Sequence, residues 1–441
     1  MISWCLFPVR IAPVWAAFIA LCALLFRVQP AGGAEGDSGR WWRGNLHTHT
    51  FWSDGDDFPE SVVDWYKRNG YQFLALSDHN VFQEGTKWLS ITNAARRAAL
   101  ANYRARFGEK WVEFRPLQST QMVRLKTFKE FRKLFEEPDR FLLLPSEEIS
   151  DKYKTLPLHL NISNLRHLIH PQGGSNVTDV LQRNIDAVLE QRQRTGRPMI
   201  PHVNHPNFGW AITAEDMLPL RGDRFFEVYN GHPAIHNDGD EHHASVERVW
   251  DILLAFRLSE RNAGPLYGLA VDDSHHYHNF VRTNSNPGRG WIMVRAPRLQ
   301  PGDLIQALEE GDFYASTGVR LKDVRRTTSE LAVEIDPEPG VSYRTQFIGT
   351  LRGFDPSSRP GPRPKSSVFL VTREYSSDIG TLLGVVEGVS ARYQLHGDEL
   401  YVRAKIISSK KKMNGFGLDE MEVAWTQPLC AGDAAGFDRV R

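Results

Sequence analysis

The stretch RGNLHTHTFWSDGDD, residues 43–57, sets two histidines one residue apart and places three acidic residues close behind them. On an extended strand, His47 and His49 would leave the same face of the backbone, so both could bind one metal ion. A single His-x-His pair is weak evidence, because such pairs also occur on solvated loops. The three acids, Asp54, Asp56 and Asp57, are further potential ligands. The meaning of the stretch therefore depends on the rest of the chain.

From residue 43 to about 296, apolar segments of strand length alternate with longer helical patterns. PESVVDWYKRNG, residues 59–70, has a proline start, apolar spacing and a closing glycine, which are typical of a helix. An Arg- and Lys-rich, partly helical insertion is expected at about 86–136. The alternation predicts an α/β architecture with a mostly parallel sheet, closed or distorted into a barrel. Strands are predicted at 43–49, 71–77, 140–145, 158–163, 198–203, 225–230, 265–271 and 291–296, and further helices at 178–193 and 243–256.

After about residue 320 the pattern changes to short alternating segments separated by turns that contain Pro, Gly and Ser. FDPSSRPGPRPKSS, residues 354–367, is predicted to be a long loop, and no helical pattern of useful length appears in this part. We therefore predict a small all-β, sandwich-like domain at 325–441, following an α/β domain at 40–320. A chain of 441 residues is long enough for two such domains.

The N-terminus has the features of an export signal. Arg10 precedes an apolar run at 11–26, and small residues follow, so we predict a signal peptide at 1–34 with cleavage after Ala34. The mature protein would then be exported, periplasmic or extracellular, without a membrane span; an uncleaved anchor is the alternative. Two of the three cysteines lie in this segment. The remaining one, Cys430, can form neither an internal disulfide nor a thiolate metal cluster by itself.

The charge of the chain is balanced, with 53 Lys and Arg against 53 Asp and Glu. This balance gives no reason to expect binding to nucleic acid or to a membrane surface. The hydrophobic fraction of 41% predicts packed cores rather than disorder.

Histidines and acids recur where predicted strands end. None of the sixteen histidines precedes His47, and only His396 lies beyond His278. The C-terminal strand ends of an α/β barrel form its active-site face, so groups from six different segments would meet at one rim. Imidazoles mixed with carboxylates suit Zn²⁺, Mn²⁺ or Fe, and paired ions can clamp a phosphoryl group and activate water. Beyond the opening stretch, these groups are Asp78, His79, Glu147, Glu148, His159, His202, His205, Asp272, Asp273 and His275.

The motifs HTHT (47–50), SDHN (77–80), SEEIS (146–150), HLN (159–161), NHP (204–206) and DDSH (272–275) resemble, in this order, those of the PHP family of polymerase-and-histidinol-phosphatase metallophosphoesterases. The resemblance covers about residues 43–318. It implies a distorted (β/α)7, TIM-like barrel that carries two or three divalent metal ions. Many members have a histidine near position 54 of this chain, and the aspartate found there, Asp54, departs from that pattern. The implied ligands are His47, His49, Glu148 and Asp273 for the first ion, Glu148, His159 and His205 for the second, and His79, His275 and Asp54 for the third.

Two pairs of adjacent acids leave a choice. Neighbouring residues on a strand point to opposite faces, so only one of each pair should bind a metal ion. The resemblance favours Glu148 over Glu147, because Glu148 takes the acid position of the family's G-x-E turn, with Ser146 in place of the glycine. It favours Asp273 over Asp272, because the family pattern is D-x-H.

Four further residues are predicted to contact the substrate. Phosphate recognition needs a cation or backbone amides, and Arg282 and Arg289 follow the last motif closely enough to reach the rim. His232 directly follows the predicted strand at 225–230, and His202 lies three residues before His205. The catalytic residues that the resemblance implies are Asp273, His275 and His205.

We therefore expect an exported metal-dependent phosphoesterase that hydrolyses a phosphate mono- or diester of a small phosphorylated substrate with a metal-activated hydroxide. One alternative is metal-dependent hydrolysis of a non-phosphate bond, as in amidohydrolase-type barrels. Those barrels place a lysine among the ligands, and no motif here has a lysine in such a position. The second alternative is a surface-binding protein with a vestigial metal site.

Overall fold

The computed structural model describes residues 39–117, 120–261, 263–362 and 371–430. The signal peptide predicted at 1–34 lies outside these ranges. Within them, no helix is both long enough and apolar enough to cross a membrane.

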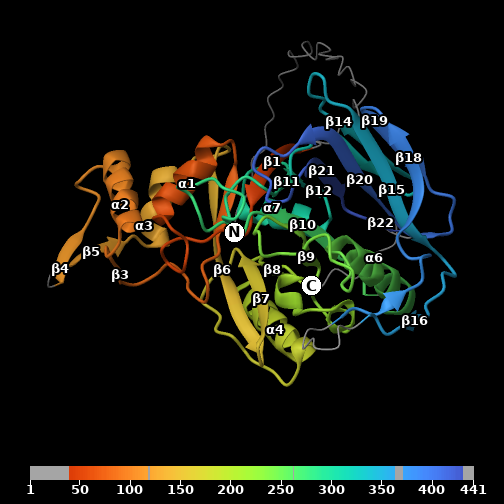
Figure 1. The fold of residues 1–441 in the computed structure, drawn as a ribbon, viewed down its shortest axis with the longest axis horizontal. Helices are drawn as coiled ribbons and strands as arrows, with labels where there is room; N and C mark the ends of the chain where they lie inside the picture. Colours follow the sequence, from red (N-terminus) through yellow and green to blue (C-terminus); the bar gives the residue numbers. More distant parts are fainter. Residues whose placement is uncertain (1–38, 118–119, 262, 363–370, 431–441) are drawn as a thin grey trace, which may run out of the picture. The chain divides into compact units, whose positions relative to one another are not determined.

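One large sheet of 14 strands organises the described part of the chain (Figure 1). In spatial order, its α/β half contains β10 (Tyr267–Val271), β9 (Phe225–Asn230), β8 (Ile200–Val203), β7 (Leu156–Ser163), β6 (Leu142–Tyr153), β2 (Phe73–Leu76), β1 (Arg40–Asn45), β11 (Trp291–Ala296) and β12 (Phe313–Ser316). Four ladders of this half are parallel: β1 with β2, β2 with β6, β8 with β9, and β9 with β10. These features confirm a mixed α/β protein with a large central sheet.

The sheet is less uniformly parallel than the alternation predicts. β7 runs antiparallel to both β6 and β8, and β11 runs antiparallel to β1. The reason is local: only Lys154 and Thr155 separate β6 from β7, and a connection that short allows a hairpin but no crossover. Among the described residues the paired path runs from β10 to β18 (Thr381–Glu387) without returning to its start.

Capped amphipathic helices cover the α/β half. α1 (Pro59–Arg68) begins with proline, and α4 (Val177–Thr195) begins after Asn176, whose side chain accepts the N–H of Asp179. α4 ends at Gly196, which takes the left-handed conformation at φ 63°. Buried side chains of α4 and α6 (Val246–Phe256) share one core with β7, β8 and β9. The remaining helices of this half are α5 (Ala214–Met217), α7 (Pro301–Glu309), a 3₁₀ turn at Phe208–Trp210 and a π turn at Arg257–Arg261.

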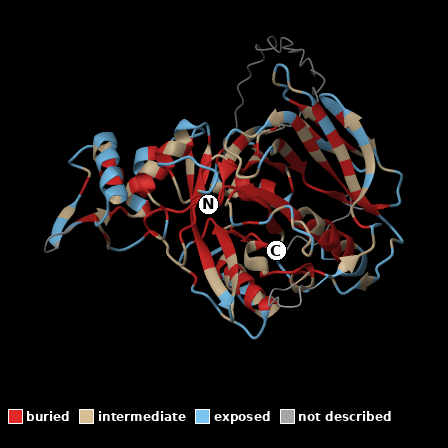
Figure 2. Ribbon diagram, in the orientation of Figure 1, coloured by how far each residue is buried: buried red, intermediate tan, exposed pale blue. Residues whose placement is uncertain are grey.

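The basic insertion forms a unit of its own between β2 and β6. It contains β3 (Lys87–Ser90), α2 (Ala94–Phe107), β4 (Phe114–Leu117), β5 (Thr120–Leu125) and α3 (Phe128–Phe135), with β5 between β3 and β4. α2 is largely exposed (Figure 2) and is attached through Tyr103. The Tyr103 ring stacks on Phe58 at 4.0 Å, and its hydroxyl donates to Glu60.

In the described part of the chain, the C-terminal strands divide between the central sheet, which five of them extend, and two small separate sheets. They are β13 (Leu321–Arg326), β14 (Glu330–Ile335), β15 (Tyr343–Leu351), β16 (Ser358–Arg359), β17 (Glu374–Tyr375), β18, β19 (Ser390–Gln394), β20 (Glu399–Lys411), β21 (Met421–Thr426) and β22 (Leu429–Cys430). β12 pairs with β21, and the path then continues through β20 and β15 to β18. The small sheet β13-β14-β19 shares a core with these strands, so this part has two β layers, one of them common to the α/β half. The domain boundary near residue 320 stays a prediction.

Candidate metal centre

The histidines of the opening stretch lie just beyond β1 and not on a strand. Thr48 forms a single β-bridge with Ser274, and the N–H of His49 donates to the Ser274 carbonyl at 3.0 Å. The N–H of Asp273 donates to the His47 carbonyl at the same distance. The strand predicted at 43–49 is therefore correct only as far as Asn45, although the His47 and His49 side chains still reach the same carboxylate, that of Asp273.

Two imidazoles and two carboxylates meet at the first group of candidate ligands. The Nε2 atoms of His47 and His49 each lie 3.2 Å from Asp273 Oδ1 and 3.4 Å from Glu148 Oε2. All four side chains are buried. Neither Nε2 atom has a hydrogen-bond partner within the described part of the chain, and Glu148 Oε2 has an ion-pair contact of 2.8 Å with His79 Nδ1. Buried polar atoms without partners are destabilising, and a cation between these groups would satisfy all of them.

Glu148 also faces a second set of imidazoles with its other oxygen. Glu148 Oε1 lies 2.9 Å from His159 Nδ1 and 3.5 Å from His205 Nε2, and it accepts a hydrogen bond of 2.8 Å from Asn204 Nδ2. His159 lies on β7, directly across from the β6 strand that carries Glu148. One carboxylate therefore lies between two groups of histidines, which is the arrangement of a bridging ligand.

A third group forms around Asp54, the most exposed of the candidates with 55% of its side chain accessible. Asp54 Oδ2 lies 3.4 Å from His79 Nε2, and Asp54 Oδ1 lies 3.4 Å from His275 Nε2. His49 joins this group through Nδ1, at 3.6 Å from Asp54 Oδ1. One donor atom from each of the four residues lies within 4.8 Å of the others, so the structure brings these residues together as a further candidate ligand set.

Burial and neighbouring charges shift the pKa values of these groups in opposite directions. Burial, and then His275 and His79, lower the pKa of His49 to about 3. Burial also acts to lower the pKa of His79, but Glu148 and Asp54 outweigh it and raise that pKa to about 11. Burial acts to raise the pKa of Glu148, yet the surrounding imidazoles, His47 first, hold it well below its usual range. Carboxylates that stay ionised beside an imidazole that resists protonation favour a bound cation.

The adjacent acids point apart, as alternating side chains should. Glu147 faces away from the histidines and accepts the N–H of Ile169 at 2.7 Å. The carboxylate of Asp272 accepts three backbone N–H groups, those of residues 288–290, and the hydroxyl of Tyr66. Glu148 and Asp273 are therefore the members of each pair that reach the histidine cluster.

Glu227 is a buried member of the site that sequence reasoning missed. Its Oε1 lies 2.6 Å from His47 Nδ1 and 3.2 Å from His202 Nε2, while its Oε2 accepts the N–H of His205 at 2.8 Å. A carboxylate behind a metal-binding imidazole fixes the tautomer and the orientation of the ring. The available signal was an acidic residue inside FFEVYN, an otherwise largely apolar strand whose six residues are all buried.

Asp78 holds the opening stretch in place and was likewise not assigned a role. It accepts hydrogen bonds from the backbone N–H of Thr50 at 2.8 Å, from the Thr50 hydroxyl at 2.9 Å and from the Ser53 hydroxyl at 2.7 Å. These contacts set the direction of the loop that carries His49 and Asp54.

The four predicted substrate contacts have different surroundings. His202 is buried against Glu227. The ring of His232 lies 5.5 Å from that of His275. Burial is the main cause that lowers the pKa of His232 to about 4. Arg289 is buried, and its guanidinium donates to three backbone carbonyls. Arg282 is exposed and donates only to the Phe416 carbonyl, at 3.3 and 3.4 Å. The structure thus brings the two histidines to the cluster and engages the two arginines elsewhere.

No family model and no curated protein matches this chain. Among solved structures, the chain is similar to a two-domain protein from Bacteroides vulgatus that is described as containing a predicted PHP-like metal-dependent phosphoesterase. The likeness covers 89% of this chain and 96% of that chain, with 13% sequence identity and a TM-score of 0.36. A likeness at this level decides neither fold nor activity, so the assignment of the site rests on its own geometry.

That geometry fits divalent metal ions. The donor set mixes imidazole nitrogen with carboxylate oxygen, which suits Zn²⁺, Mn²⁺ or Fe better than Mg²⁺ or Ca²⁺. Nine side chains from six segments supply it: His47, His49, Asp54, His79, Glu148, His159, His205, Asp273 and His275.

Proposed function

We propose that this chain is a metal-dependent phosphoesterase of the PHP type. The observation that carries the proposal is the position of Glu148, whose two oxygens face two separate sets of histidines across one buried cluster. A carboxylate placed in this way is suited to bridge paired ions, and paired ions are suited to phosphoryl transfer.

The chain's own residues would hold two or three ions. His47, His49, Asp273 and Glu148 would hold the first, Glu148 with His159 and His205 the second, and Asp54 with His79 and His275 the third. When bound, such ions lower the pKa of water and neutralise the charge of phosphoryl oxygens. Glu227 would keep the His47 ring oriented through its contact with Nδ1, and His232 would border the site beside His275.

A cavity of about 480 Å³ is the best candidate for the rest of the substrate. It opens beside the metal centre, because His159 and Ser150 line it and the Ser150 hydroxyl lies 2.5 Å from His79 Nδ1. Lys152 also lines it, and its exposed ammonium has no ion-pair partner among the described residues. Lys152 therefore replaces Arg289 as the cation that would contact phosphate.

We also propose a barrel, a separate β domain and export for this chain. β10 lies close to β11 and β12. This closure would complete a distorted (β/α)7 barrel at 40–320. A sandwich-like β domain would follow at 325–441. The charge-balanced chain would be exported after cleavage of the 1–34 segment, and its substrate would be a small phosphorylated molecule.

The alternatives have less support. Amidohydrolase-type hydrolysis would need a lysine among the ligands, and none of the six motifs contains a lysine. A vestigial site would be free to lose its ligands, whereas here unpartnered buried donors still converge on common points.

The proposal is tested by hydrolysis of p-nitrophenyl phosphate and bis(p-nitrophenyl) phosphate with added Zn²⁺, Mn²⁺ or Fe²⁺. We expect turnover of at least one ester by the wild type and its loss in His49→Ala and Asp273→Ala. His170→Ala, which changes an exposed histidine outside the cluster, should behave as wild type. Full activity in both cluster variants, or no hydrolysis of either ester with any of the metals, would contradict the proposal.

A further inference from the structure

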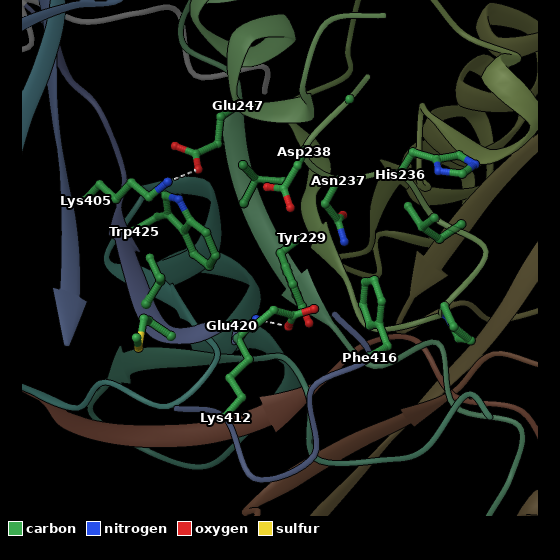
Figure 3. A pocket seen from close by; sticks show the side chains of 16 residues that line it. Tyr229, His236, Asn237, Asp238, Glu247, Lys405, Lys412, Phe416, Glu420 and Trp425 are labelled. Carbon is green, nitrogen blue, oxygen red and sulfur yellow. Dashed lines mark hydrogen bonds and ion pairs between the residues drawn. The ribbon is translucent and has the colours of Figure 1, made fainter. Parts of the chain in front are cut away.

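A second cavity of about 380 Å³ lies away from the metal ligands. Its walls are the loop after β9, the start of α6, and the hairpin of β20 and β21 (Figure 3). None of the candidate metal ligands lines it. Pro233 and Ile235 line it from the loop, whereas His232 of the same loop lies beside His275 in the metal centre. The loop is thus a wall shared by two different sites.

Three aromatic side chains form one continuous side of this cavity. The Tyr229 ring lies 6.0 Å from that of Trp425 and 6.5 Å from that of Phe416, with interplanar angles of 26° and 27°. A planar ring inserted between two others needs a separation of about 7 Å, twice the contact distance between carbon atoms. The three rings therefore leave no slot for a nucleobase and form a wall against which a ligand can lie.

Two buried polar groups in this wall lack a hydrogen bond of proper geometry. They are Trp425 Nε1, beside the Glu247 carboxylate, and the Tyr229 hydroxyl, beside the Lys412 ammonium. Their residues are only 4% and 6% exposed, and both line the cavity. Both atoms are shielded from solvent beside these charged neighbours, so the hydroxyls of a ligand would meet the charged groups at the edge of the wall instead.

The charged groups around the wall are nearly neutral as a set. Lys405 is paired with Glu247, and Lys412 is paired with Glu420 at 3.0 Å (Figure 3). Asp238 adds one exposed carboxylate that has no ion-pair partner in the described part of the chain. A phosphate would meet no free cation here, whereas the paired groups keep spare lone pairs and N–H protons for neutral hydroxyls.

We propose that this cavity binds a neutral saccharide of one or two rings. The apolar C–H face of a sugar ring suits the negative faces of aromatic rings, and its hydroxyls suit the mixture of donors and acceptors around them. A volume of about 380 Å³ is in the range of small-ligand pockets. The site does not depend on the proposed phosphoesterase activity, and saccharide binding can be measured whether or not hydrolysis is found.

Isothermal titration of the full-length protein with maltose, cellobiose and N,N′-diacetylchitobiose tests the proposal. We expect at least one disaccharide to bind with a Kd of about 1 mM or tighter. Phe416→Ala should weaken that binding about tenfold, and Phe416→Trp should restore it. Leu418→Ala is the matched control, because Leu418 is an 80% exposed residue of the same hairpin outside the cavity. Asp238→Asn, a change at an exposed side chain, should weaken binding without affecting the fold.

Three results would overturn the proposal: no binding of any disaccharide; binding that Phe416→Ala and Asp238→Asn leave at the wild-type value; or binding of adenosine or inorganic phosphate in preference to the sugars. A loss of binding in Leu418→Ala equal to that in Phe416→Ala would also count against it, because it would show a general effect on the hairpin.

Discussion

Two buried charged clusters in this molecule differ in whether their polar atoms have hydrogen-bond partners. On α6, Asp251 accepts Arg403 Nε at 2.8 Å with one oxygen and Arg403 Nη2 at 2.7 Å with the other, and the Tyr401 hydroxyl donates to it at 2.8 Å. In the metal centre, the Nε2 atoms of His47 and His49 have no hydrogen-bond partner within the described residues. The first cluster is fully hydrogen-bonded, whereas the second leaves buried imidazole nitrogens without a partner among those residues.

This difference separates a structural cluster from a functional one. The Asp251 cluster joins α6 to β20, and its paired charges match each other with bidentate geometry. The candidate metal centre brings imidazoles and carboxylates from six segments together and leaves two buried imidazole nitrogens without a hydrogen bond in the described part of the chain. Burial of charge is common to both clusters, so it is the unpartnered, convergent atoms that indicate a ligand.

The largest expected effect is at Glu148. Glu148→Gln keeps the size of the side chain but removes the charge that lies between both sets of histidines. We expect the rate of phosphoester hydrolysis to fall by about a thousandfold or more, equivalent to about 4 kcal/mol. Steady-state kinetics against Glu147→Gln, a change in the neighbour that faces away, provides the control. Equal losses in the two variants would mean that Glu148 has no special position.

The matching change in the complete cluster is Arg403→Met. It leaves Asp251 buried without its partner, so the free energy of unfolding should fall by about 3–5 kcal/mol. Urea denaturation measures this, and the metal content of the variant that remains folded should be unchanged. A stability equal to wild type would show that the buried pair does not hold α6 against β20.

Removal of metal should distinguish the clusters by stability. Ions that bind only the folded state stabilise it by about 3 kcal/mol when present at a hundred times their Kd. Dialysis against a chelator should therefore lower the Tm of wild type and of Arg403→Met but leave Glu148→Gln almost unchanged. A Tm of the wild type that does not respond to chelation and metal return would contradict the account of the incomplete cluster.

A smaller effect is expected at Lys152, in the cavity beside His159. Lys152→Ala removes an exposed charge from the proposed phosphate contact, so KM should rise by about threefold to tenfold while kcat changes little. Lys154→Ala, at the tip of the same β6–β7 hairpin, is the control. An unchanged KM would remove Lys152 from the proposed substrate site.

The smallest expected effect concerns a third buried charge, on α1. Burial raises the pKa of Glu60, although Tyr103 and Trp111 donate to it. A raised pKa in the folded state means that stability is fully present below the ordinary pKa of about 4.3 and is lost as pH rises through the folded value. Glu60→Gln should therefore gain stability relative to wild type when the pH rises from about 5 to about 8. Urea denaturation at both values measures it, and a difference that does not change with pH would contradict this assignment.

Local sequence patterns predicted the bounds of several strands, but they could not predict which strands pair when these lie far apart in the sequence. The strands at 225–230 and 291–296 have the predicted bounds, because apolar runs mark buried strands directly. The direction of β7 could not be read from its composition, and the ladder between Tyr314 and Thr426 joins residues too far apart in sequence for any local pattern to reveal.

In the candidate site, too, local motifs identified the candidate ligands, but contacts between distant segments could not be predicted. The candidate ligands within the motifs lie together, because each follows or occupies a strand of one sheet. Glu227 was missed because its role depends on His47, 180 residues away, and nothing in its own strand identifies that partner. Arg289 was expected at the rim from its loop position, but one of its backbone-carbonyl partners, Asn414, lies in the hairpin of β20 and β21, which is distant in sequence.

The most direct test of the incomplete cluster is the metal content of the purified protein. Elemental analysis of wild type should find two or three ions of Zn, Mn or Fe per chain, and Glu148→Gln should retain fewer than one. A folded wild-type protein that hydrolyses phosphoesters with fewer than one such ion per chain, or a Glu148→Gln variant with the wild-type content, would contradict the central claim that these side chains are arranged around metal ions.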